Sequence, residues 1–284
     1  MRLITLGPKG TFSEEAALRF YERSGRKTPL SLEFSTIPGC LRAVERFQAD
    51  YAVLPAENMV DGIIGTTFDA LIDFHDSVKV CDELHLPVHL VLAAAPSAAI
   101  DNIRLVLSHP SPLSQCLNNL AKLLPHAVQQ PTESTAAAAK MVQERLDCAA
   151  VCSPKTAKEY GLKVIHDSLA DYPHNETRFL LCSLADSPPT GNDRTLLAVR
   201  FGVNQPGQLH AVTGILAERG IDLSFVQSRP YKVRPQDYVL LFELSGHKND
   251  PLVEEALSLI EQFVRKTDGW KKVLGSFPQR EKGV

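Results

Sequence analysis

The chain has 284 residues, of which 44% are hydrophobic and 22% are charged, and its formal net charge is −3. This composition predicts an ordinary soluble core, and the length fits one large or two medium domains. Aromatic residues make up only 7% and no long run of Lys or Arg occurs, which argues against a nucleic-acid surface.

The N-terminal segment carries no signal-peptide pattern. Met1–Gly7 leads directly into an expected strand, without a basic segment, an apolar run and a small-residue cleavage site. The longest apolar stretch, Leu84–Ile100, is interrupted by His, Pro and Ser residues, so it does not predict a membrane span. We therefore expect a cytoplasmic protein without membrane partners.

The cysteines indicate small buried side chains rather than ligands. No Cys-x-x-Cys pair occurs, and several cysteines lie in apolar runs. The six are Cys40, Cys81, Cys116, Cys148, Cys152 and Cys182. The sequence thus predicts no metal site, no disulfide framework and no cofactor fingerprint.

Up to residue 182, short apolar segments alternate with helical patterns. Strands are expected at Leu3–Leu6, Leu32–Ser35, Tyr51–Leu54, Leu105–Leu107, Cys148–Cys152 and Lys163–Ile165, and helices at Glu14–Tyr21, Gly39–Gln48, Thr66–Phe74, Leu113–Leu123 and Thr135–Glu144. This alternation favours an α/β fold with a mainly parallel, doubly wound sheet. The segment Leu86–Leu92 predicts a strand that crosses into a second lobe.

A polar, turn-rich linker at Ser183–Asp193 separates two predicted domains, residues 1–183 and residues 194–277. After the linker the expected order is strand, helix, strand, strand, helix, strand: Thr195–Val203, Pro206–Arg219, Ile221–Ser228, Tyr238–Leu244, Pro251–Val264 and Lys272–Ser276. This βαββαβ order is the ferredoxin-like unit. A unit of this size after a complete α/β domain indicates a regulatory or assembly module.

The first strand-to-helix junction, Gly7–Glu14, offers two interpretations. Thr11 and Glu14 have the spacing of a capping box, in which each side chain bonds the backbone of the other residue. The first N–H groups of the helix would alternatively bind an anion. The segment lacks the glycine and lysine pattern of a nucleotide site.

Later junctions carry further uncharged donors. Asn58 can donate to a ligand oxygen, and its neighbour Glu57 becomes a candidate general acid if it is buried, or a solvated turn residue if it is not. Ser108 ends a strand and Gln115 follows on the next helix. Ser134 starts an Ala-rich helix, as a plain N-cap or as part of a carboxylate site.

Thr177 and Arg178 start the apolar run Phe179–Cys182, which predicts a buried strand. The guanidinium fork suits a carboxylate, and the hydroxyl is able to donate to a departing oxygen. Because such strand ends usually meet at one edge of a parallel sheet, these residues together predict a pocket for a small dicarboxylate. The alternative is an ordinary strand edge with a solvated arginine.

Five ordered sequence blocks resemble the prephenate dehydratase family, and the tail resembles its ACT regulatory domain. The blocks are Gly7-Pro8-x-Gly10-Thr11-Phe12-Ser13, Pro55-x-Glu57-Asn58, Ser108-His109-Pro110 with Gln115-Cys116, Glu133-Ser134-Thr135-Ala136-Ala137-Ala138 and Asn175-x-Thr177-Arg178-Phe179. The tail carries Pro206-Gly207-x-Leu209, Gly220-Ile221-Asp222-Leu223 and Ser228-Arg229-Pro230. The resemblance covers nearly the whole chain.

The resemblance implies a bilobal catalytic domain like the periplasmic binding proteins, with its site in the cleft, plus a C-terminal ACT domain. It implies cofactor-free conversion of prephenate to phenylpyruvate, with loss of water and carbon dioxide. By resemblance the catalytic residues are Thr177, Asn58, Ser108 and Gln115, and the substrate-binding residues are Thr11, Phe12, Ser13, Glu57, Ser134, Thr135, Arg178 and Phe179. Phenylalanine is the expected regulatory ligand, held by Gly207, Gln208, Leu209, Gln227, Ser228 and Arg229 in a homodimer or homotetramer.

Three single positions and one three-residue segment depart from the family pattern. Met59 stands where Ser or Thr is usual, Ser111 where Gln is usual, and Gln227 where Glu commonly precedes Ser-Arg-Pro, while Gln208-Leu209-His210 replaces an apolar run. Two alternatives to the dehydratase remain at this point: a non-aromatising prephenate decarboxylase and a bilobal sensor that binds a small anion without reaction.

Overall fold

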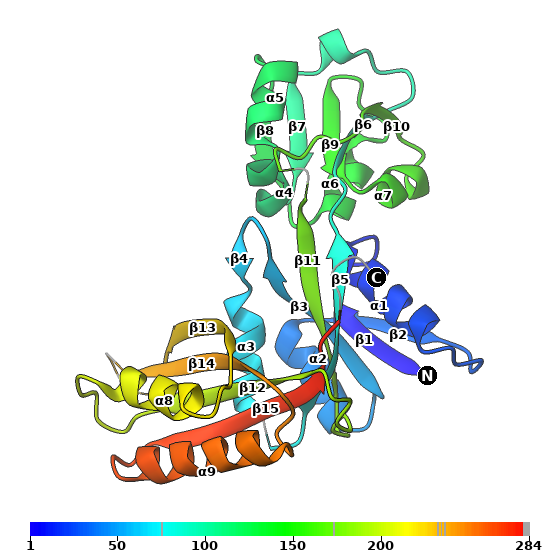
Figure 1. The fold of residues 1–284 in the computed structure, drawn as a ribbon. Coiled ribbons are helices and arrows are strands. Elements are labelled where there is room, and N and C mark those ends of the chain that lie inside the picture. Colours follow the sequence, from blue (N-terminus) through cyan, green and yellow to red (C-terminus); the bar gives the residue numbers. More distant parts are fainter. Residues whose placement is uncertain (75, 173, 232, 234, 236, 281–284) are drawn as a thin grey trace.

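The structure, a computed structural model, describes residues 1–74, 76–172, 174–231, 233, 235 and 237–280. The described strands form three separate sheets, each with its own helices. Figure 1 shows two of these units, the first and second lobes, one above the other, with the C-terminal domain beside the first lobe.

The first lobe holds the sheet β2-β1-β3-β11-β5, with β4 paired to β3. Strand β1 runs parallel to β2 and β3, whereas β11 runs antiparallel to both β3 and β5. The elements are β1 (Arg2–Leu6), α1 (Phe12–Arg23), β2 (Ser31–Ser35), α2 (Ile37–Glu45), β3 (Tyr51–Asn58), β4 (Gly62–Ile63), α3 (Gly65–Asp73), β5 (Lys79–Pro87) and β11 (Glu176–Ser183). Helix α1 covers one face of this sheet, and α2 and α3 pack on the other.

The second lobe holds the sheet β10-β6-β9-β7-β8. Its elements are β6 (Val91–Ala94), a 3-10 turn (Ile100–Asn102), β7 (Leu105–Ser108), α4 (Pro110–Gln115), α5 (Leu117–Leu123), β8 (Val128–Pro131), α6 (Thr135–Val142), β9 (Cys148–Cys152), α7 (Pro154–Glu159) and β10 (Lys163–His166). Every residue of β9 is buried, and its small side chains let the alanines of α6 pack closely on the sheet.

The expectation of one mainly parallel, doubly wound sheet is wrong in its topology. The strands divide into two mixed sheets, because β5 and β11 form an antiparallel pair and the chain passes between the lobes after β5 and again before β11. A short apolar run does not reveal its direction in a sheet, so the sequence pattern could not distinguish these arrangements. The two-lobed arrangement itself is confirmed, and the chain does cross between the lobes within Leu86–Leu92. The single strand expected there is wrong, because β5 ends at Pro87 and β6 begins only at Val91.

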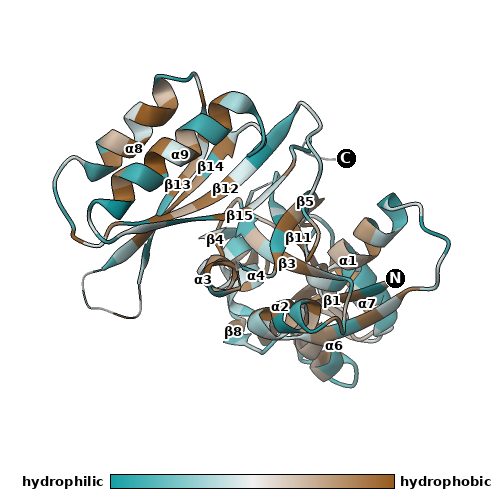
Figure 2. Cartoon of the chain, turned by 90° about the horizontal axis from the view of Figure 1, so that it is seen from below, coloured by the Kyte–Doolittle hydropathy of each residue, from teal (hydrophilic) through white to brown (hydrophobic). Residues whose placement is uncertain are grey.

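The C-terminal domain has the predicted βαββαβ order. Its elements are β12 (Asp193–Arg200), α8 (Gln208–Ala217), β13 (Leu223–Pro230), β14 (Tyr238–Ser245), α9 (Pro251–Arg265) and β15 (Trp270–Pro278). The strands form the antiparallel sheet β13-β14-β12-β15. Figure 2 shows α8 and α9 over one face of this sheet, and residues of α9 at three- and four-residue spacing, such as Val253, Ala256 and Ile260, enter its core.

The other face of the C-terminal sheet packs on the first lobe. Leu241 and Phe277 belong to the same buried cluster as Leu71 of α3, and the ring of Phe225 stacks on that of Phe68 with centroids 5.5 Å apart. At Gly275, a Cβ atom would stand 2.1 Å from the carbonyl oxygen of Val80, so β15 lies directly against β5. The two domains therefore share one apolar core.

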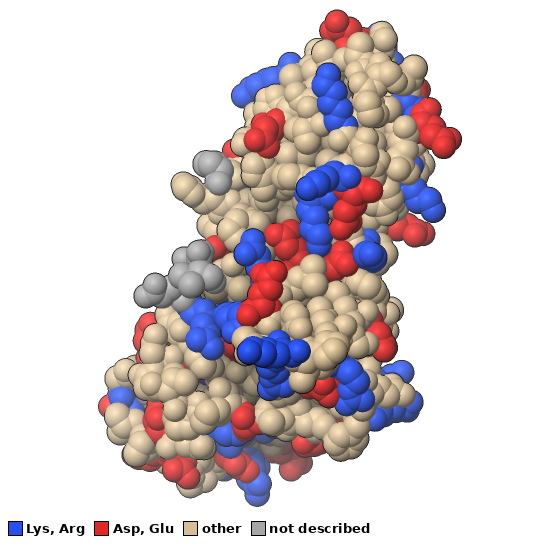
Figure 3. All heavy atoms as spheres, turned by 90° about the vertical axis from the view of Figure 1, so that its right-hand side faces the viewer, with Lys and Arg blue, Asp and Glu red and all other residues tan. Residues whose placement is uncertain are grey.

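The helices, the cysteines and the surface charges bear on the properties that the sequence argued against. Of the helices described here, none has the length and apolar character that crossing a membrane requires. All six cysteines are unbridged, and burial raises the pKa of Cys40, Cys116 and Cys152 to about 12, so these thiols stay protonated. On the face drawn in Figure 3, acidic and basic side chains are interspersed rather than gathered by sign.

Candidate active site

Thr177 and Arg178 point to opposite faces of β11, because successive side chains of a strand alternate. Thr177 shares its face with Phe179, which packs in the α1-side core with Leu84 and Leu86. Arg178 shares its face with Leu180, which lies in the core that includes the C-terminal sheet. Thr177 and Arg178 therefore face different cores, on opposite sides of the first-lobe sheet.

Side chains from both lobes meet around Thr177. Asn58 Nδ2 donates to Thr177 Oγ1 at 3.0 Å and to Asn175 Oδ1 at 3.0 Å. Asn175 Nδ2 donates to Gln115 Oε1 at 2.7 Å, and Gln115 Nε2 donates to Asp61 Oδ2 at 2.6 Å. We call Asn58, Asp61, Gln115, Asn175 and Thr177 the amide cluster.

The orientation of each amide in this cluster is fixed by its neighbours. The backbone N–H groups of Val60 and Asp61 donate to Asn58 at 2.9 and 3.1 Å, so the atom that accepts them must be its oxygen. Asn58 therefore turns its NH₂ group toward Thr177 Oγ1. The Thr177 oxygen is the acceptor in this bond, which leaves the hydroxyl hydrogen to be donated elsewhere.

Ser111, one of the departures from the family pattern, lies beside the amide cluster. Its hydroxyl bonds the Asp61 carboxylate and accepts from Gln115 Nε2 at 2.9 Å. The nearby His109 imidazole accepts the backbone N–H of Ser111, and burial lowers its pKa although the Asp61 carboxylate acts in the opposite direction. Met59, by contrast, is exposed.

A second polar group forms where the first lobe's β1–α1 loop touches the second lobe. Thr156 Oγ1 donates to the carbonyl oxygen of Gly10 at 2.9 Å. At Gly10, whose φ is +80°, a Cβ would stand 3.1 Å from the Cβ of Ala136. The loop before α1 and the first turn of α6 therefore approach each other across the lobe boundary, and Phe12 packs against the cores of both lobes.

The caps of these two helices differ. Ser134 N-caps α6, its hydroxyl accepting the N–H of Ala137 at 3.0 Å, and Thr135 is buried beside it. The capping box expected at α1 is absent: Glu14 accepts the N–H of Gly10 at 2.9 Å, and the Thr11 hydroxyl donates to the Pro8 carbonyl oxygen at 3.0 Å. The loop folds back on itself, so Glu14 reaches one residue further than a capping box requires. Ser13 is buried at the same helix start.

Ser108, Glu57 and Arg178 have neighbours outside the amide cluster. Ser108 is fully buried and donates to the Val151 carbonyl oxygen at 2.6 Å, which commits its hydrogen to the second-lobe sheet. Glu57 pairs in register with Arg178 and lines a cavity of about 440 Å³ against the C-terminal domain. Arg178 donates to Glu83 at 2.7 Å and to Glu243 at 2.6 Å, and it is 7% exposed. These partners correct the expected role of Arg178, since its fork is already occupied by protein carboxylates.

Of the six residues expected at the regulatory ligand, four line a cavity of the C-terminal domain and two do not. A cavity of about 290 Å³ in the C-terminal domain is lined by Gly207, Gln208, Leu209 and Ser228 together with Phe201, Asn204, Gln205, Asp237, Tyr238 and Leu240. Gln227 and Arg229 are not among its walls. They share a strand face with Phe225, toward the first lobe, where Arg229 donates to Asp69 at 3.0 Å. The expected contact of Gln227 with a regulatory ligand stays a prediction, and the cavity described here does not include that residue.

Comparison with known proteins identifies the fold. Residues 3–187 match the family described as prephenate dehydratase, and residues 196–258 match the ACT domain. The chain belongs to the prephenate dehydratase family. A bifunctional chorismate mutase/prephenate dehydratase of Aquifex aeolicus is 37% identical, over 98% of this chain and 74% of that protein. The prephenate dehydratase of Mycolicibacterium gilvum is 34% identical, over 98% of this chain and 91% of that protein.

A solved structure supports the same assignment. The prephenate dehydratase of Arthrobacter aurescens, solved in complex with L-Phe, superposes with a TM-score of 0.86 at 28% identity and covers 100% of this chain and 92% of that one. The family reaction is prephenate dehydration, so the chain is a carbon–oxygen lyase of phenylalanine biosynthesis. Asn175, Asp61 and Ser111 contact the candidate residues Asn58 and Gln115 but were not among the candidates selected from the sequence.

Proposed function

We propose that Thr177 donates its hydroxyl hydrogen to the C4 hydroxyl of prephenate as that group leaves. The observation that carries this proposal is the fixed Asn58 amide, which makes Thr177 Oγ1 an acceptor and so directs its hydrogen away from Asn58. A threonine hydroxyl is a weak acid, so its contribution is mainly a positioned hydrogen bond that strengthens as negative charge develops on the departing oxygen.

The electron flow needs no cofactor. The bond between the ring and its carboxylate breaks and releases carbon dioxide, its electron pair enters the ring, and the C4–oxygen bond breaks to complete the aromatic system. The departing oxygen takes up a proton, which comes from solvent because the Thr177 hydroxyl supplies only a hydrogen bond, and leaves as water. Since aromatisation drives the reaction, the protein's task is to orient both carboxylates and to stabilise the leaving oxygen.

We place the substrate carboxylates at the converging starts of α1 and α6. Backbone N–H groups and the helix dipole favour anions at such ends, and the hydroxyls of Thr11, Ser13, Ser134 and Thr135 lie on the same two segments. The contact between Gly10 and Ala136 supports this placement because it joins both ends in one region. Phe12 supplies an apolar surface there for the ring.

Incubation of the purified protein with prephenate tests the reaction. Phenylpyruvate is the expected product. A dihydro product that retains the hydroxyl would indicate the non-aromatising decarboxylase instead, and binding without turnover would indicate the sensor.

We also propose that phenylalanine binds in the cavity of the ACT domain. Backbone N–H groups at Gly207 and Gln208, where α8 begins, suit its carboxylate, and Leu209 and Leu240 suit its ring. Strand β13 is an edge strand of its sheet, and Val226 on it is 45% exposed, so a homodimer or homotetramer built across this edge would bring two cavities together.

Two phenylalanine substitutions on β13 test the binding site. Ser228→Phe places a ring in the cavity and should abolish calorimetric binding of phenylalanine to the full chain. Val226→Phe places the same ring two residues earlier on the same strand face, outside the cavity walls, and should leave binding intact. Equal affinities of the two variants would contradict the proposed site.

A further inference from the structure

Arg178 joins two domains through buried charges. Its Nε donates to Glu83 Oε2 on β5 at 2.7 Å, and its Nη2 donates to Glu243 Oε2 on β14 at 2.6 Å. Glu83 belongs to the first lobe and Glu243 to the ACT domain, and both carboxylates are almost fully buried. One guanidinium is therefore shared by the two domains.

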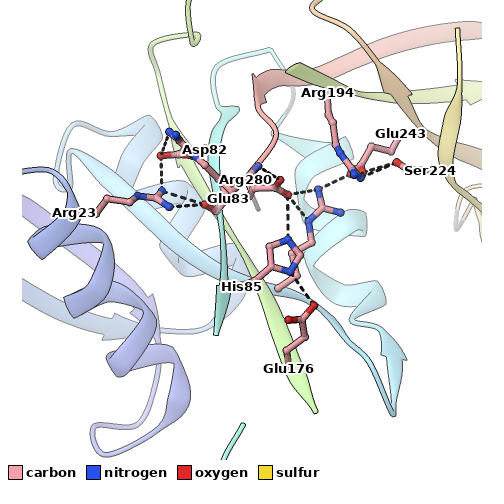
Figure 4. Close-up of polar contacts among 10 residues, drawn as sticks. Arg23, Asp82, Glu83, His85, Glu176, Arg194, Ser224, Glu243 and Arg280 are labelled. Carbon is pink, nitrogen blue, oxygen red and sulfur yellow. Dashed lines mark hydrogen bonds and ion pairs between the residues drawn. The ribbon is translucent and has the colours of Figure 1, made fainter. Parts of the chain in front are cut away.

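The carboxylates have further partners that hold them in place. Glu243 also accepts from Arg194 Nη1 and, at 2.7 Å, from Ser224 Oγ, while Glu83 accepts the backbone N–H of Arg280 at 2.9 Å. Figure 4 shows these side chains converging from the first lobe and the ACT domain. We call Arg178, Glu83, Glu243, Arg194 and Ser224 the interdomain charge cluster.

Arg178 links the interdomain charge cluster to Thr177, the residue before it in the chain. Its backbone is bonded directly to Thr177, so a force on the guanidinium acts on the strand that carries the proposed donor. Strand β11 is held by β3 and β5 on its two sides, and near Arg178 the pairing with β3 contains a register shift. A bulge weakens the backbone ladder locally, so the side-chain contacts of Arg178 carry more of the task of fixing this segment.

We propose that Arg178 is a positioning residue, which the ACT-domain carboxylate Glu243 holds so that Thr177 keeps its catalytic placement. The proposal rests on the proposed donor role of Thr177. The ACT domain then contributes to the catalytic geometry even without a regulatory ligand. If β14 moved relative to β5, Glu243 would move relative to Glu83, and Arg178, which bonds both carboxylates, would shift with them. The adjoining cavity of about 440 Å³, lined in part by Arg178, Arg194 and Glu243, leaves room for such a shift.

The molecule offers a matched control. Arg229 of the ACT domain pairs with Asp69 of α3 through two hydrogen bonds of 3.0 Å, which also join the domains but do not contact β11. Glu243→Gln and Asp69→Asn are the same chemical change, carboxylate to carboxamide, at two interdomain contacts. Ser224→Ala, which removes one donor to Glu243 from an exposed position, is a milder variant in case Glu243→Gln does not fold.

The experiment measures prephenate turnover by the full chain. We expect Glu243→Gln to lower kcat about tenfold with KM within about twofold, because a small misplacement of a catalytic group costs rate rather than binding. Ser224→Ala should lower kcat by about twofold to threefold, and Asp69→Asn should leave kcat at the parental value. In a Thr177→Val background, Glu243→Gln should produce no further fall, since residues that act through one another are not additive.

A general loss of domain stability would behave differently. In that case Glu243→Gln would lower kcat by the same factor in the Thr177→Val background as in the parent, and Asp69→Asn would lower kcat as much as Glu243→Gln does. Either result overturns the proposal. A parental kcat in Glu243→Gln also overturns it. Hydrogen exchange of the β11 amides supplies a readout independent of turnover, and it should accelerate in Glu243→Gln but not in Asp69→Asn. If Thr177→Val itself keeps the parental kcat, the donor role of Thr177 is refuted. Unchanged hydrogen exchange in β11 of Glu243→Gln is then the result that refutes the positioning role of Arg178.

Discussion

Replacement of Thr177 by Val tests the proposed donor with little change of shape. Thr177 is 8% exposed, and Val keeps its branched volume while removing the hydroxyl. Asn58 Nδ2 loses one acceptor but retains Asn175 Oδ1 at 3.0 Å and the Glu176 carbonyl oxygen at 3.2 Å, so both of its hydrogens remain bonded. The free energy of unfolding should therefore fall by only about 1 kcal/mol, the typical net value of one hydrogen bond.

The effect on the reaction should be larger. Loss of one donor to the developing charge costs about 3–4 kcal/mol of transition-state stabilisation, which lowers kcat by about 10²–10³-fold. KM should change little, because the bond is strongest in the transition state. Phenylpyruvate formation in steady state gives both constants, urea unfolding gives the stability, and Thr177→Ser, which restores the hydroxyl, is the control. A Val variant with near-parental kcat, or a Ser variant as impaired as the Val variant, would refute the reasoning.

Two further predictions concern Asn58 in the candidate site and Glu243 between the two domains. Asn58→Asp replaces the NH₂ group by an oxygen, so the Thr177 hydroxyl would donate to residue 58 instead of to substrate; kcat in the phenylpyruvate assay should fall at least about 10²-fold, and a parental rate would show that the amide orientation is irrelevant. Burial alone would raise the pKa of Glu243, but the charge of Arg178 and the hydrogen bonds from Ser224, Arg194 and Arg178 outweigh it and hold that pKa below its ordinary value. Because the folded-state pKa is lowered, Glu243 stabilises the protein above the ordinary glutamate range, and this contribution is lost as the pH falls from about 4.5 through the folded-state value. Urea unfolding of the parent and of Glu243→Gln between about pH 3 and pH 7 should show a shallower acid loss in the variant, and identical slopes would contradict the assignment.

Several elements of the fold follow from local chemistry alone. The βαββαβ order of the tail was predictable because Gly220 stops a helix that Pro206 precedes, and because period-two strands alternate with a strongly amphipathic helix at Pro251–Arg265. The N-cap at Ser134 was one of two interpretations left open, and the structure shows its hydrogen bond from the N–H of Ala137. Strand directions and the division into two sheets were not predictable, since hydrophobic periodicity carries no information on pairing partners.

The candidate site was also predictable only in part from the sequence. Asn58 and Gln115 were selected as polar residues at strand-to-helix junctions, and they do meet near Thr177. Glu243 offered a signal that the reasoning did not use: a single acid inside the apolar run Val239–Leu244 must have a buried cationic partner, because an unpaired buried charge is too costly. The sequence could not name that partner.

The sequence by itself determined the family, most of the element types, the two-part chain and most of the donors near Thr177, because each depends on short-range patterns of residues. It gave no sign of the short elements β8 and α7. Only the tertiary structure decided which way each donor points. Alternation along β11 separates Thr177 from Arg178, and the ACT sheet then supplies Glu243 from 65 residues further along the chain to pair with that arginine. Side-chain partners of this kind depend on how distant strands pack, and no local pattern of residues encodes that packing directly.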